Sequence, residues 1–96
     1  MATKYVVEYV DAKSIAERRK RLLASGKTDA ELDACDDWWD PACHMAVADA
    51  GNTLGTARIV AKRVVASASH YGEGELMEVY EDDDGFTCHR FVEQVS

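Results

Sequence analysis

The hydrophobic and polar positions of the chain repeat with two periods, one typical of strands and one typical of helices. The first segment, Lys4–Val10, is rich in β-branched and aromatic residues and predicts a strand. Leu76–Glu81 and Phe86–Gln94 have the same character and flank the sequence Asp82-Asp-Asp-Gly85. Asp at the start of this connection suits a type I turn, and Gly at its end suits positive φ. We therefore expect a C-terminal β-hairpin.

The segment after the first strand has the pattern of an amphipathic helix. Apolar side chains recur at three- and four-residue steps over residues 12–23, with charged residues between them. Asp11 is placed to cap the start of this helix, and Gly26 is placed to end it in the left-handed conformation. The basic residues of the segment are therefore expected mostly on its exposed face.

Two further helices are indicated by their start signals. Thr28 and Glu31 form a capping box, and the helix that they begin is expected to run to about Trp38. Asp40-Pro41 again has the residues of a helix start, which predicts a short helix over residues 41–50. The apolar residues of this short segment also alternate with a period of two, so a strand remains its alternative.

The longest helical pattern follows Asn52, which can cap it, and is expected to end at Gly72. Its apolar stripe consists mostly of small residues, so another element can pack closely against it. Together, the segments predict a single α+β domain over residues 1–96. We expect a three-stranded antiparallel sheet, made of the N-terminal strand and the C-terminal hairpin, covered on one face by three to four helices.

Charge is distributed along the chain in blocks. There are 11 Lys and Arg residues against 18 Asp and Glu residues, which gives a formal net charge of −7. Residues 12–27 carry six basic groups and one acid, whereas residues 29–49 and 73–84 each carry seven acids and no Lys or Arg. Such blocks steer association with partners of opposite charge, and they do not determine a fold.

The sequence also limits the cellular setting. No apolar run approaches the roughly 20 residues that a membrane-spanning helix needs. The N-terminus lacks the layout of a secretion signal. The chain has three cysteines, and an odd number does not suit the disulfide framework of a secreted protein. We expect a cytoplasmic protein without a membrane partner.

Cysteine and histidine residues raise the question of a metal site or a thiolate nucleophile. They occur as Cys35, Cys43-His44 and Cys88-His89. Zinc sites usually use paired short spacings such as Cys-x-x-Cys, and adjacent Cys and His side chains point apart. No third residue is placed to orient a Cys–His pair. We expect no metal, no cofactor and no catalytic residue, and hence a protein that is not an enzyme; a role for the three cysteines is left open.

The two acidic blocks are the candidate binding surfaces. In the first block, Trp38 stands among carboxylates, a combination typical of a protein-binding hot spot. The second block lies along the first strand of the predicted hairpin and in its turn. Spaced carboxylates of this kind can imitate the charges of a nucleic-acid backbone. The residues expected to contact a partner are Asp33, Asp36, Asp37, Trp38, Asp40, Glu78, Glu81, Asp82, Asp83 and Asp84.

The basic segment supports an alternative function. A small nucleic-acid-binding regulator could contact phosphates through residues 12–27 and stack bases on Trp38 and Trp39. The acids on either side of this Trp pair and the net negative charge oppose a phosphate backbone. Direct nucleic-acid binding is therefore the second hypothesis.

Small size, acidity and a layout of helices with a hairpin, taken over the whole chain, resemble those of inhibitors encoded by phages and mobile elements, anti-CRISPR proteins in particular. The resemblance implies a non-catalytic inhibitor that occludes the basic, nucleic-acid-binding groove of a larger ribonucleoprotein complex such as a CRISPR effector. It also implies action in the cytosol of the host cell. The identity of the partner, the acidic block that binds it and the oligomeric state are left open.

Overall fold

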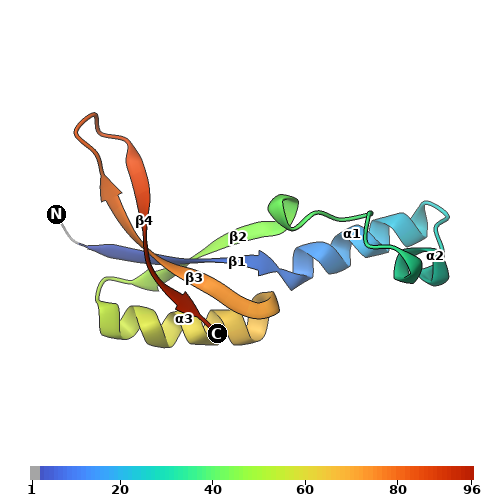
Figure 1. Cartoon of the computed structure of the whole chain (residues 1–96), viewed down its shortest axis with the longest axis horizontal. Coiled ribbons are helices and arrows are strands. Elements are labelled where there is room, and N and C mark those ends of the chain that lie inside the picture. The colour runs from blue at the N-terminus through green and yellow to red at the C-terminus, as the bar shows by residue number, and fades with distance from the viewer. Residues whose placement is uncertain (1–2) are drawn as a thin grey trace.

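The computed structural model describes residues 3–96 and shows an α+β protein, as predicted (Figure 1). The strands are β1 (Lys4–Asp11), β2 (Met45–Gly51), β3 (Ser69–Glu81) and β4 (Thr87–Val95). The helices are α1 (Ala12–Ala24), α2 (Asp29–Ala34) and α3 (Leu54–Ala68), and η1 (Pro41–His44) is a short 3₁₀ helix. None of the helices over residues 3–96 is long and apolar enough to cross a membrane.

The strands form one antiparallel sheet with the order β2-β1-β3-β4. The N-terminal strand pairs with the first strand of the C-terminal hairpin, as the sequence predicted. The sheet has a fourth strand, β2, on the other side of β1. The predicted three-stranded sheet was therefore one strand short.

β2 lies in the segment for which a helix was predicted. The start signal does act locally, because Asp40 Oδ1 accepts a hydrogen bond from the Ala42 amide at 3.0 Å and Pro41 opens a helical turn. This turn ends after four residues, at His44. From Met45 onward the chain pairs with β1, whose edge supplies the backbone partners that a strand needs. The prediction of a helix over residues 41–50 was wrong, and the alternative prediction of a strand in this segment is confirmed.

Helix α3 covers one face of the sheet and contacts all four strands. Its small residues Ala57 and Ala61 are fully buried, as are Val7 of β1 and Leu76 of β3. The small side chains let the helix approach the sheet closely, as its stripe predicted. The helix starts one residue later than expected, because its cap is Thr53, whose Oγ1 accepts from the Thr56 amide.

Helices α1 and α2 project beyond the sheet, and we call residues 12–40 the helical arm (Figure 1). The predicted caps of both helices are present, with Asp11 accepting from the Lys13 amide and Thr28 accepting from the Glu31 amide. Helix α2 ends at Ala34, before the predicted end at Trp38. The prediction that three to four helices cover the sheet was wrong. Helices α1 and α2 lie in the arm, and α3 is the helix that covers the sheet. The molecule is accordingly elongated, with extents of 51 × 30 × 17 Å.

The hairpin turn between β3 and β4 is formed as predicted. The Asp82 amide donates to the Phe86 carbonyl at 3.0 Å, and the Gly85 amide donates to the Asp82 carbonyl at 3.0 Å. Gly85 has φ of 82°, a conformation that glycine adopts without steric cost. The tip of this hairpin and the helical arm lie at opposite ends of the molecule (Figure 1).

Candidate partner-binding surfaces

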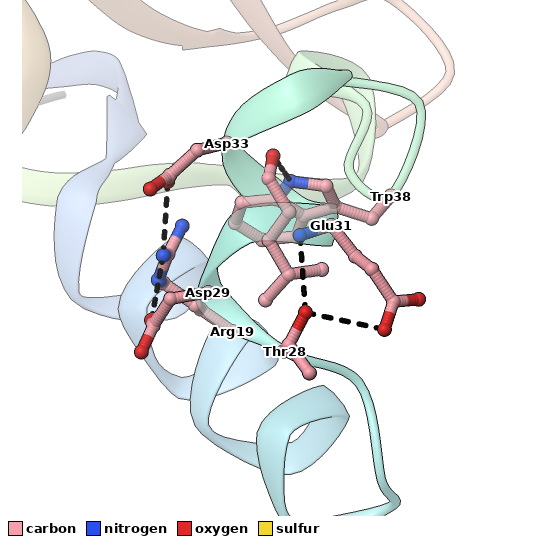
Figure 2. Close-up of polar contacts among 7 residues, drawn as sticks. Arg19, Thr28, Asp29, Glu31, Asp33 and Trp38 are labelled. Atoms are coloured by element: carbon pink, nitrogen blue, oxygen red, sulfur yellow. Dashed lines mark hydrogen bonds and ion pairs between the residues drawn. The ribbon is translucent and has the colours of Figure 1, made fainter.

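The arginines of α1 draw part of the first acidic block into the helical arm. Arg19 Nη2 donates hydrogen bonds to Asp29 Oδ1 at 2.8 Å and to Asp33 Oδ1 at 3.0 Å (Figure 2). The hydrogen bonds to Asp29 and Asp33 raise the pKa of the Arg19 guanidinium above its ordinary value, and the bond to Asp29 has the larger effect. Asp33, which was predicted to contact a partner, is therefore already paired within the chain.

Trp38 holds the loop after α2 onto the two helices. Its indole Nε1 donates to the Leu32 carbonyl at 3.0 Å (Figure 2). Arg18 Nε donates to the Trp38 carbonyl at 2.9 Å, and the Arg19 guanidinium carbon lies 6.0 Å from the centroid of the indole ring. Trp38 is half-buried by these contacts. Its position has a structural cause within the arm, and its contact with a partner stays a prediction.

Trp39 joins the arm to the sheet through an aromatic cluster. Its ring centroid lies 4.9 Å from that of His70, and 6.3 Å from those of both His44 and Tyr71. Ser14 Oγ and His44 Nδ1 are 2.7 Å apart and add a polar contact between α1 and η1. The sequence pattern did not predict this cluster, because residues 70 and 71 were expected in the long helix, whereas they lie in β3.

The other acids of the first block lie close to basic groups. Asp36 and Asp37 are exposed and form no ion pair within residues 3–96. Asp40 caps η1, and it lines the same hollow of about 370 Å³ as Asp37, Arg18 and Arg21. Over residues 12–40, six basic residues oppose seven acids, so the formal charge of the arm is −1. The arm therefore has little net charge to attract a basic partner.

The second acidic block keeps its charge. We call residues 73–95 the acidic hairpin; they contain eight acids and one basic residue, Arg90, for a formal charge of −7. This equals the net charge of the whole chain. Of these acids, Glu93 pairs with Arg58 of α3, and the other carboxylates of the acidic hairpin form no ion pair among the described residues. The hairpin's His89 contacts Glu8, an acid of β1.

The residues of the acidic hairpin that were predicted to contact a partner differ in their exposure and in their contacts within the chain. Asp82 is half-buried and shapes the turn, because its Oδ1 accepts from the amides of Asp84 and Phe86 at 2.9 Å each. Glu78 is half-buried and lies opposite Arg90 in the β3–β4 register. The guanidinium of Arg90 lies over the Tyr80 ring, 4.6 Å from its centroid. The exposed carboxylates among the predicted residues of this block are those of Glu81, Asp83 and Asp84.

Metal-ligating residues are dispersed over the described part of the chain. Residues 3–96 contain no group of three or more His, Cys, Asp or Glu side chains that could hold a metal ion. The three cysteines are free thiols; Cys35 and Cys43 are exposed, and Cys88 is half-buried.

Comparisons of the chain with protein families, with curated proteins and with solved structures find no match. The charge, the exposure and the placement of the side chains described above are therefore what bears on function.

Proposed function

We propose that the chain is a non-catalytic binding protein whose acidic hairpin engages a basic, nucleic-acid-binding surface of a larger protein or ribonucleoprotein complex. One observation carries the proposal: the acidic hairpin holds a formal charge of −7, whereas the helical arm holds −1. The two acidic blocks of the sequence look equivalent, but the arginines of α1 oppose only the first of them. The hairpin is thus the part of the chain that a basic partner attracts most strongly.

The shape of the acidic hairpin suits entry into a groove. Its tip extends beyond the α3 layer and ends in a narrow two-stranded turn (Figure 1). Glu81, Asp83 and Asp84 are exposed there, and the turn itself is held by the Asp82 side chain. Carboxylates fixed on a hydrogen-bonded turn lose less conformational freedom on binding than those of a flexible loop. They can therefore replace phosphates as partners of Lys and Arg side chains.

Occupation of such a groove excludes nucleic acid, so the proposal includes inhibition. This is the role implied by the resemblance to anti-CRISPR proteins, and it makes guide-loaded CRISPR effector complexes the first partners to test. The proposed site of action is the cytosol of the host cell, where those complexes work.

Two charge-matched triple variants test the proposal. The first, E81Q/D83N/D84N, removes the exposed carboxylates near the tip and spares Asp82, which the turn needs. The second, E17Q/D36N/D37N, removes three exposed carboxylates of the helical arm, none of which forms an ion pair within residues 3–96. Both variants lose the same formal charge, so a difference between them reports position and not net charge.

Binding is measured by biolayer interferometry against a panel of purified, guide-loaded effector complexes. We expect the wild-type chain to bind, the arm variant to bind equally well, and the hairpin variant to bind at least about tenfold more weakly, which corresponds to about 1.4 kcal/mol. Loss of affinity confined to the arm variant would move the interface to the acids around Trp38. Absence of binding to every complex would refute the assignment to CRISPR effectors.

A further inference from the structure

A hollow of about 450 Å³ lies where the helical arm meets the first residues of β3. Apolar side chains of α1 line it together with four rings, two from the loop after α2 and two from β3. Asp36 also lines it, whereas the neighbouring Asp37 lines the hollow around Arg18 and Arg21. We call this site the aromatic hollow, and the residues that matter to its chemistry are Ile15, Asp36, Trp38, Trp39, His70 and Tyr71.

The rings of the aromatic hollow are contiguous and only partly covered. The Trp39 centroid lies 6.3 Å from that of Trp38, in addition to its contacts with His70 and Tyr71. The two Trp side chains are half-buried, and Tyr71 is 54% exposed. The faces of aromatic rings carry partial negative charge and attract cations. These rings are therefore accessible to a positively charged ligand.

The charges beside the rings favour the same kind of ligand. Arg19 lines the hollow, but its guanidinium is paired with Asp29 and Asp33. The Asp36 carboxylate is exposed and forms no ion pair within residues 3–96. One guanidinium and three carboxylates give this neighbourhood a formal charge of −2. The charge attracts a cation and repels a phosphate group.

We propose that the aromatic hollow binds the side chain of an arginine from a partner protein. A guanidinium is planar, so it stacks on ring faces, and its N–H groups match the two oxygens of a carboxylate such as that of Asp36. Its methylene stem can lie along apolar surface, which Ile15 contributes here. Guanidinium groups already lie over rings within the chain, as in the contacts of Arg19 with Trp38 and of Arg90 with Tyr80.

This site goes beyond the proposed function and does not rest on it. The acidic hairpin and the helical arm lie at opposite ends of the molecule (Figure 1). The arm variant E17Q/D36N/D37N is expected to keep its affinity for the partner of the hairpin, so the arginine belongs to a second partner. Loss of one site leaves the other to be measured separately.

Nuclear magnetic resonance titration with a blocked Gly-Arg-Gly peptide tests the proposal on the isolated chain. We expect saturable shifts of the indole Nε1–H signals of Trp38 and Trp39. Blocked Gly-Lys-Gly should bind more weakly, because an ammonium group lacks the planar face. Blocked Gly-Leu-Gly and adenosine monophosphate should give no saturable shift of these signals.

Two pairs of matched variants locate the site. D36N should weaken binding of the arginine peptide by up to about fivefold, as for an exposed ion pair. D37N removes the same charge from the neighbouring residue, which lines the other hollow, and should bind as the wild type does. Y71A should weaken binding by about two- to fivefold, whereas F91A, which removes another ring that is 54% exposed, should not.

Circular dichroism checks that each variant is folded. D36N tests the proposal even if Y71A loses its fold, because the Asp36 side chain is exposed and forms no ion pair within residues 3–96. Absence of a saturable shift with the arginine peptide would overturn the site. Equal binding of the leucine peptide or the nucleotide would overturn the cation as its ligand, and equal binding of the lysine peptide would overturn the guanidinium. Equal effects of D36N and D37N, or of Y71A and F91A, would overturn the location.

Discussion

Gly74 lies in β3, beside β1 in the sheet and beneath α3, and its replacement by alanine tests how closely these elements pack. A Cβ atom at this position would lie 2.8 Å from the Glu8 carbonyl oxygen and 2.9 Å from Val65 Cγ2. It would also lie 3.3 Å from Tyr9 Cβ. The Glu8 oxygen belongs to the backbone of the paired strand, so it cannot move away without disturbing the β1–β3 pairing. The added methyl group therefore forces the helix or the strand to shift.

The cost of such overpacking is about 1–3 kcal/mol of unfolding free energy. In a domain of this size, each kcal/mol lowers the melting temperature by about 4–8 °C. Because a whole domain is stable by only about 5–15 kcal/mol, the change is large enough to measure with certainty. Gly74 has no positive φ, so the predicted effect comes from the contact and not from backbone strain.

Gly55 provides the matched control. It lies in the first turn of α3, and a Cβ there would meet nothing within 4 Å. Alanine at this position should stabilise the protein by about 0.4–1 kcal/mol, because it restricts the unfolded chain. Urea denaturation followed by circular dichroism measures both variants. The reasoning predicts opposite signs for G74A and G55A, and wild-type stability for G74A would refute the close packing of α3 on the sheet.

Two further predictions concern the hairpin turn and the basic helix. D82A should lose protection of the backbone amides from hydrogen exchange at the tip of the acidic hairpin, because the Asp82 carboxylate accepts hydrogen bonds from two amides there. D82N keeps an acceptor oxygen and should retain most of this protection. Equal protection in both variants would mean that the strands alone hold the turn. In a gel shift at low salt, the chain should not bind duplex DNA, because α2 acids occupy Arg19 and the formal charge of the arm is −1; salt-sensitive binding would instead favour the nucleic-acid-binding alternative.

The sequence predicted those elements whose local signals agree with their tertiary surroundings. The caps at Asp11 and Thr28 and the turn ending at Gly85 depend on contacts within a few residues, and all of them are formed. The small-residue stripe of α3 likewise predicted a helix packed closely on the sheet. Segments of this kind need no information from distant parts of the chain.

The predictions failed where distant contacts decide the structure. Ala46, Ala48 and Ala50 have high helix propensity, yet they lie in a strand that pairs with β1. Their small size suits a strand beneath α3, and burial and pairing outweigh propensity in such a place. The end of α3 was misplaced for a similar reason: Tyr71 continues the apolar spacing of the helix, but it lies with His70 in β3, where both rings pack against Trp39.

The candidate surfaces were predictable as lists of acids but not as charged surfaces. Nothing local indicated that Arg19 would pair with both Asp29 and Asp33, because this contact depends on the way α2 folds back along α1. The pairing separates two blocks of equal composition into a nearly neutral arm and a strongly acidic hairpin. The formal charges can be counted in the sequence, but the pairing of α1 with the first block is visible only in the folded chain.

The acidic hairpin is proposed to occupy a surface that otherwise binds nucleic acid. Equilibrium competition on a guide-loaded effector complex tests it most directly, with labelled target DNA displaced by increasing amounts of the chain. We expect the wild-type chain to displace the DNA and E81Q/D83N/D84N to need at least about tenfold more protein to do so. Simultaneous binding of the chain and the DNA, with neither changing the affinity of the other, would contradict it.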